Sequence, residues 1–114
     1  MTATEAGVIA CECRAWVNFN GAGVVAIVAG SNVSSVTDNG VGDYTINFTT
    51  AMRDANYAFA GSVRKNSDVS GGNAGIMTLA SASKTASAVR IYIGTGWSTP
   101  GVIDSTEIHV MVFR

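Results

Sequence analysis

Two Asn-Gly pairs, Asn20-Gly21 and Asn39-Gly40, stand between alternating apolar runs in the first half of the chain. Asn and Gly both tolerate the positive φ that the central positions of a tight hairpin turn require. An Asn-Gly pair between such runs is therefore a strong short-range hairpin signal. The segment 13–49 predicts successive antiparallel strands, and it constrains the chain to an all-β fold.

The strand pattern continues through the rest of the sequence. We predict strands over residues 13–19, 24–29, 32–37, 44–49, 57–63, 75–80, 86–93 and 107–113. Their spacing is typical of an antiparallel β-sandwich or a jelly-roll-like domain. The length of 114 residues suits one core. We therefore predict a single β domain over residues 1–114, with 1–12 as an N-terminal arm that is flexible or contacts a partner.

Alternation predicts which strands have a solvated face. In segment 44–49 the apolar Tyr44, Ile46 and Phe48 alternate with polar residues, as on a one-sided sheet. Segments 24–29 and 108–113 are apolar on both faces, so we expect other copies of the chain to bury the second face. The predicted homo-oligomer interface consists of Val25, Ile27, His109, Met111 and Phe113. An intertwined trimeric β-prism is the alternative fold, because three chains around one axis also produce two-sided apolar strands.

Charge and hydropathy exclude two classes of partner. The net charge is −1 and the seven basic residues are scattered, so no stripe could follow a phosphate backbone. We predict no nucleic-acid partner. The longest apolar run, 24–29, is far shorter than the roughly 18 residues of a membrane span, so none is predicted. The N-terminus lacks the basic region of a signal peptide, which predicts a cytoplasmic origin.

Few residues could carry chemistry. His109 is the only histidine, and it lies within an apolar strand, where packing or an interface is the ordinary explanation. Cys11 and Cys13 are predicted to be buried or half-buried free thiols, because a metal site would need two more ligands. Asp38 and Asp43 flank DNGVGD without the spacing of a calcium loop, so turn formation is favoured there. No nucleophile elbow or phosphate loop is present. We predict a non-enzymatic protein with no catalytic residue, cofactor or metal.

A loop tryptophan gives a separate basis for binding. Trp97 lies in GTGWSTPG, where its flat apolar ring is flanked by hydroxyl side chains, as in sites that stack on sugars. The predicted receptor or glycan contact consists of Trp97, Ser98 and Thr99. Trp16 lies within a strand, where packing or an interface is favoured over ligand stacking.

Three runs of the sequence carry a family resemblance: CRAWVNFNG, NVSSVTDNGVGDYTINFTTAM and DANYAFAGS. They resemble a β module of tailed-bacteriophage structural proteins, which often ends tail-fibre chains. The resemblance covers 13–63 closely and 104–114 more loosely. It implies a virion structural protein assembled in the host cytoplasm, with a tail-fibre tip that attaches to the host as the leading role. A capsid decoration protein is the alternative, and a glycan-binding module is the second alternative. The resemblance also implies a homotrimer that contacts other virion proteins and a host surface glycan or protein.

Overall fold

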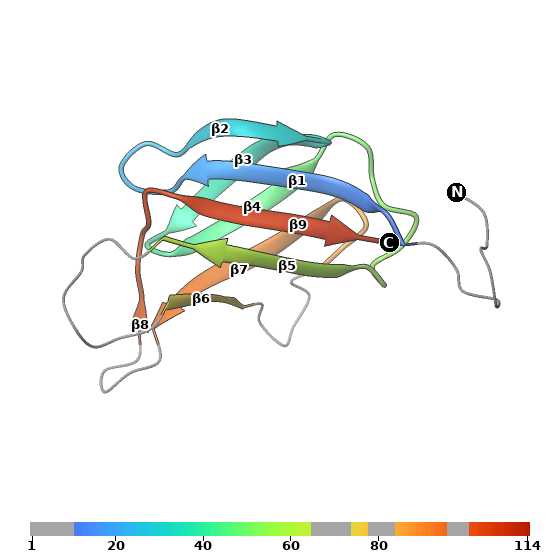
Figure 1. The fold of residues 1–114 in the computed structure, drawn as a ribbon. Helices are drawn as coiled ribbons and strands as arrows, with labels where there is room; N and C mark the ends of the chain where they lie inside the picture. The colour runs from blue at the N-terminus through green and yellow to red at the C-terminus, as the bar shows by residue number, and fades with distance from the viewer. Residues whose placement is uncertain (1–10, 65–73, 78–83, 96–100) are drawn as a thin grey trace.

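The computed structural model describes residues 11–64, 74–77, 84–95 and 101–114, which form two antiparallel β-sheets packed face to face (Figure 1). Sheet I has four strands, in the spatial order β2 (Ala26–Ser31), β1 (Cys13–Asn20), β9 (Ile108–Phe113) and β5 (Ala58–Val63). Sheet II has five strands: β3 (Val33–Gly40), β4 (Asp43–Phe48), β7 (Ala88–Thr95) and β6 (Ala74–Met77) in that order, with β8 (Gly101–Val102) also paired to β7. The predicted all-β antiparallel sandwich is confirmed.

The predicted strands agree closely with the observed ones. Each of the eight predicted segments overlaps a strand, although residues 78–80 of segment 75–80 lie outside the described residues. The sequence did not reveal β8, because two residues are too few for an alternation pattern. Every described strand is hydrogen-bonded to another strand of the same chain. The chain therefore folds as a sandwich on its own, and the intertwined prism is not its fold.

The core fills the space between the inward faces of the two sheets. Phe19 of β1 meets Tyr44 of β4 edge to face, with ring centroids 5.2 Å apart. Phe48 and Tyr57 form a second such pair at 5.7 Å. Each pair adds about 0.5–1.5 kcal/mol beyond the burial of its area. The other buried apolar residues are Ala15, Val17, Ile46, Met52, Val89, Ile91, Ile93, Ile108, Val110 and Val112.

The two Asn-Gly pairs lie at hairpins, β1–β2 and β3–β4, as predicted. The asparagines act differently from the prediction, because neither has a positive φ. At these two hairpins the residues with a positive φ are Gly23, Gly40 and Gly42. In the second hairpin the turn centres on Val41 and Gly42, and Asn39 Nδ2 donates to Thr45 Oγ1 at 2.8 Å. The asparagine therefore stabilises the hairpin through its side chain rather than through its backbone conformation.

The connection from β2 of sheet I to β3 of sheet II is a single residue, Asn32. It connects β2 to β3 in the left-handed conformation, with a φ of 56°. Its Nδ2 donates to the carbonyls of Arg14 and Thr50, at 3.0 and 3.1 Å, and its Oδ1 accepts from the Thr50 N–H at 2.7 Å. Asn is one of the few non-glycine residues that adopt this conformation readily, and here its side chain also bonds β1 and the chain after β4.

The two ends of the sandwich differ in what they carry. One end, the loop pole, holds the connections 21–25, 41–42 and 103–107. The opposite end holds the start of β1 and the C-terminus, where the Arg114 N–H donates to the Glu12 carbonyl at 3.1 Å. Figure 1 shows the loop pole on the left and the C-terminus on the right. At the C-terminus the Arg114 guanidinium donates two hydrogen bonds to Asp54, at 3.1 and 2.8 Å, and lowers the pKa of Asp54 to about 2.

Candidate functional site

The outer face of sheet I carries large apolar side chains that the chain itself leaves exposed. Trp16 of β1 is directly opposite Met111 of β9, so both side chains lie on this face. Trp16 is 41% exposed and Met111 is 37% exposed. We call this surface the sheet I outer face; it comprises Ala29, Ser31, Trp16, Asn18, His109, Met111, Phe113, Ala58, Ala60 and Ser62.

The large and small side chains of this face are sorted by strand. The two central strands, β1 and β9, carry Trp16, Met111 and Phe113. The two outer strands, β2 and β5, carry only alanine and serine where their outward residues pair with the outward residues of β1 and β9. These are Ala29 and Ser31 on β2, and Ala58, Ala60 and Ser62 on β5. The face is therefore raised along its middle and low along both sides.

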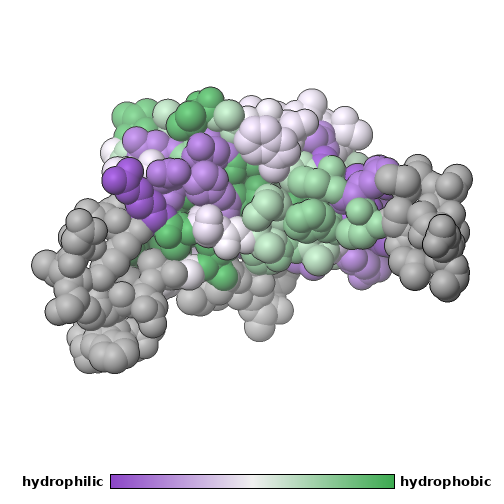
Figure 2. Space-filling view, in the orientation of Figure 1, coloured by the Kyte–Doolittle hydropathy of each residue, from purple (hydrophilic) through white to green (hydrophobic). Residues whose placement is uncertain are grey.

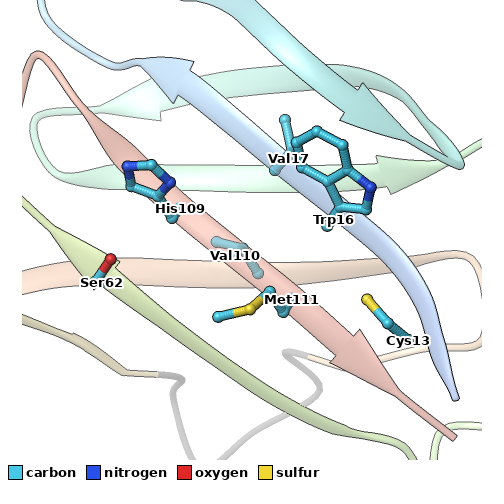
Figure 3. Close-up of a pocket in the computed structure, with 7 residues that line it drawn as sticks. All are labelled: Cys13, Trp16, Val17, Ser62, His109, Val110 and Met111. Carbon is cyan, nitrogen blue, oxygen red and sulfur yellow. The ribbon is translucent and has the colours of Figure 1, made fainter.

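A depression of about 310 Å³ lies on this face beside the tryptophan. Figure 3 shows how its lining residues project from β1, β9 and β5. The residues that line it are Cys13, Trp16, Val17, Ser62, His109, Val110 and Met111. Cys11 and Cys13 are free, as predicted, but both are exposed rather than buried or half-buried. The depression is mainly apolar, with one hydroxyl, one thiol and one imidazole at its sides.

Charged groups are kept to the two ends of the face. Toward the loop pole, His109 Nε2 lies 2.9 Å from Glu107 Oε1, and Arg64 Nη1 lies 3.7 Å from Glu107 Oε2. At the other end Arg14 pairs with Glu12 at 3.0 Å. Figure 2 shows the same distribution, with green and white residues across the middle and hydrophilic residues toward both ends. A neutral apolar centre with polar ends resembles the apolar core and polar rim of protein interfaces.

One polar atom of this face lacks a partner. Asn18 Oδ1 is buried and finds no hydrogen-bond donor within the part of the chain that the structure describes. Asn18 lies in the cross-strand row between Ala29 of β2 and His109 of β9. Buried polar atoms without a partner are rare in folded proteins, so we expect a bound water or a neighbouring molecule to donate to this atom.

The loop pole is held together by one buried hydroxyl. Tyr44 Oη lies 2.6 Å from Asp104 Oδ1 and 2.8 Å from the Gly21 carbonyl, and the Gly42 N–H donates to Asp104 at 2.8 Å. Burial, together with the neighbouring Asp104 carboxylate, raises the pKa of Tyr44 above its ordinary value. A side chain at position 21 would collide with the Tyr44 hydroxyl, so only glycine fits there. Three loops are thus fixed to one another at this pole.

The predicted site residues do not all lie together. The structure places His109, Met111 and Phe113 on the sheet I outer face. Val25 is half-buried and packs against the core, and Ile27 lies opposite Phe19 at the edge of the sheet, 40% exposed. Within one chain every residue of β2 is exposed, so neither face of this strand is buried by its own domain.

The predicted glycan contact, Trp97, Ser98 and Thr99, lies outside the described residues. The strands on either side of it are described, and Thr95 pairs with Gly101 at the loop pole. For Trp16 the sequence favoured packing or an interface, and the structure places it on the sheet I outer face. Nothing in the sequence indicated Ser62, which becomes a neighbour of His109 only through the β5–β9 pairing.

The outer face of sheet II has a different chemistry. Asn47 Nδ2 donates to Ser35 Oγ and Thr37 Oγ1, at 3.1 and 3.0 Å. Arg90 donates two hydrogen bonds to the Asp43 carboxylate, at 2.9 and 2.7 Å, and lowers the pKa of Asp43. Asp43 is thus paired with an arginine, and Asp38 caps the Gly40 N–H at 3.0 Å, in agreement with the turn role predicted for this segment.

Within the described residues, no group of three His, Cys, Asp or Glu side chains could hold a metal ion. The same part of the chain contains no helix long and apolar enough to cross a membrane. No family model matches the chain, and no curated protein or solved structure matches it.

Proposed function

We propose that this protein is a non-enzymatic structural module of a bacteriophage virion and that it works as a homotrimer. The observation that carries the proposal is the sheet I outer face, an exposed neutral surface centred on Trp16 and Met111. Its composition is that of a surface covered by another protein. The family resemblance of segment 13–63 supplies the virion as the setting and three as the favoured number.

A tail-fibre tip is the role that we favour within the virion. In a tip, one end of the module is joined to the shaft and the opposite end meets the host. The start of β1 and the C-terminus lie at one end of the sandwich, and the loops lie at the other. The Tyr44–Asp104 hydrogen bond fixes those loops, which gives a rigid platform for recognition. Receptor contact through the loop segment of Trp97, Ser98 and Thr99 belongs to this proposal.

Light scattering over a dilution series tests the homotrimer. We expect a mass three times that of the chain, independent of concentration, and a stable monomer would contradict the proposal. The place in the virion is tested by labelling particles that carry the protein with antibody fragments against it. Label at fibre ends supports the tip. Label spread over the head would support the alternative, a capsid decoration protein.

A further inference from the structure

We propose that three copies of the folded sandwich form a closed three-sided β-prism, in which β2 of each copy pairs with β5 of the next and the sheet I outer faces meet on the three-fold axis. This arrangement rests on the proposed homotrimer and specifies how its chains meet. Each chain keeps its own sandwich, so the prism is made by docking and not by intertwining.

The first support is the chemistry of the two outer strands. β2 and β5 are the outermost strands of sheet I, and neither contains a charged residue or a proline. Natural proteins usually protect an exposed strand edge with charge or proline, because unpaired N–H and C=O groups are a template for another strand. Val28, in the middle of β2, is also 69% exposed. β2 has one irregularity, at Val28 in its register with β1. Apart from that irregularity, both strands lack the features that keep an edge unpaired.

The second support is strand direction. β2, β1, β9 and β5 alternate in direction across sheet I, because each neighbouring pair is antiparallel. β2 and β5 therefore run in opposite directions. Rotation about an axis along the strands preserves direction, so β2 of one copy meets β5 of the next as an antiparallel pair. The four-stranded sheets can thus join into a continuous antiparallel ring without any change in the fold.

The third support is size. Strands lie about 4.8 Å apart, so a four-stranded sheet forms a side of about 19 Å. In a three-sided prism each side then lies about 5.5 Å from the axis, close to half of the roughly 10 Å between packed sheets. A four-sided ring would leave about 10 Å from each sheet to the axis, which these side chains would not fill. Two copies could pack face to face, but their strand edges would stay unpaired.

The fourth support is the sorting of side chains by strand. The middle of each side is the part that faces the axis of a three-sided prism, while space narrows at the corners, where two sheets meet. The sheet I outer face carries Trp16 and Met111 on its central strands. Its outer strands carry Ala29, Ala60 and Ser62 at this face. Large residues thus lie where the axis has to be filled, and small residues lie where the corners require them.

The arrangement also accounts for Asn18. Its buried Oδ1 has no donor in the described part of its own chain, and it lies on the face that would meet the other copies. Side chains of a neighbouring copy would supply polar groups next to it. A buried acceptor that becomes paired on assembly favours the assembled state, because leaving it unpaired is costly.

Cysteine cross-linking tests the strand pairing directly. In one chain Ser31 and Ala60 lie in the same cross-strand row, separated by Trp16 and Met111. That separation is about 14 Å, and a disulfide requires about 4.4–6.8 Å between Cα atoms. A disulfide between these positions can therefore form only between copies. The background is Cys11→Ser with Cys13→Ser, and the four variants combine cysteine at Ala29 or Ser31 with cysteine at Ala60 or Ser62.

We expect at least one of the four variants to give a covalent trimer on a non-reducing gel after mild oxidation. A trimer by light scattering that gives no covalent trimer from any of the four would overturn the prism and leave the proposed homotrimer standing. Covalent dimers from Ser31→Cys or Ala29→Cys alone would show two β2 strands side by side, which also overturns the prism. A monomer at every concentration would overturn both.

A charge on the β2 edge gives an independent readout. Val28→Lys places an edge-protecting residue where β5 of the next copy would pair, and we expect a monomer or a trimer that dissociates on dilution at least tenfold more readily. Thr37→Lys is the control for charge, because it places the same charge on β3, the edge strand of sheet II. It also removes the hydrogen bond from Asn47, which should lower stability without changing the mass. An unchanged trimer with Val28→Lys would contradict edge pairing.

Discussion

The outer faces of the two sheets are built on the same alternation and have opposite properties. On sheet II the outward side chains bond to one another, as in the pairs of Asn47 with Thr37 and of Arg90 with Asp43. On sheet I the central strands present Trp16 and Met111 outward, and both leave apolar surface exposed. A face whose polar groups are satisfied needs no further partner, whereas an exposed neutral apolar face does. The comparison supports the proposal that other chains cover sheet I, whereas the outward polar groups of sheet II are satisfied within the chain.

The largest expected loss of stability comes from placing a charge on the inward, core-facing side of β9. Val110 is 1% exposed and adjoins Met111 in the sequence. Val110→Asp would bury a charge without a partner, so we expect a loss of at least about 3 kcal/mol and an insoluble or unfolded chain. Thermal unfolding followed by circular dichroism measures this. Val110→Ala, which only opens a small cavity, should stay folded. A soluble, folded Val110→Asp variant would mean that β9 does not face the core in this way.

Met111→Asp tests the difference between the two outer faces, because it places the same charge on the outward side of β9. We expect a folded monomer, since three such charges around one axis would repel each other and lose their hydration. Thr45→Asp is the control on the sheet II outer face. It replaces the Thr45 hydroxyl that accepts from Asn39, so it should lower stability, but it should keep the mass of the native protein. Light scattering distinguishes the two. Equal masses for both variants would remove the distinction between the faces.

A smaller effect is expected from removing polar contacts on sheet II. Asn47→Ala deletes the hydrogen bonds to Ser35 and Thr37, which are solvent-exposed. We expect a loss of about 1 kcal/mol in the free energy of unfolding. The mass in solution should not change. Urea unfolding together with light scattering measures both quantities, and a loss of association in this variant would show that sheet II also meets other chains.

The smallest effect concerns pH on sheet II. Arg90 holds the pKa of Asp43 below its ordinary value of 3.8. A lowered folded pKa means that the pair stabilises the fold above pH 3.8, and that this contribution is lost as pH falls through the lowered pKa. Because Arg90 is 45% exposed, solvent screening should keep this contribution small. Asp43→Asn should flatten the acid dependence of stability over this range. An unchanged acid slope would show that the pair contributes nothing measurable.

Much of the fold was predictable because strand signals are local. The alternation of Tyr44, Ile46 and Phe48 with polar residues identifies β4 and its buried face without knowledge of any other strand. The two-sided apolar character of segment 108–113 likewise identified β9 and the exposure of Met111. The β1–β2 and β3–β4 hairpins followed from short turns, whose register depends on residues next to each other in the chain.

The site was less predictable because it depends on contacts between distant segments. Val25 and Met111 look alike in the sequence, but the first packs against the core and the second lies on the outer face. The asparagine of each Asn-Gly pair was expected to supply a positive φ, and the turn of the second hairpin instead centres two residues further on. Such shifts are decided by side-chain bonds across the hairpin, as between Asn39 and Thr45.

The sequence by itself determined the β class, the position of the strands and which side of most strands is apolar, because alternation has a period of two residues and is read within one strand. Only the tertiary structure decided which strands are neighbours. It placed β2 and β5 at the two edges of sheet I, brought Trp16 opposite Met111, and paired Asp43 with Arg90, 47 residues away. Strand order arises from non-local pairing, and the edge and face of a sheet exist only once that pairing is made.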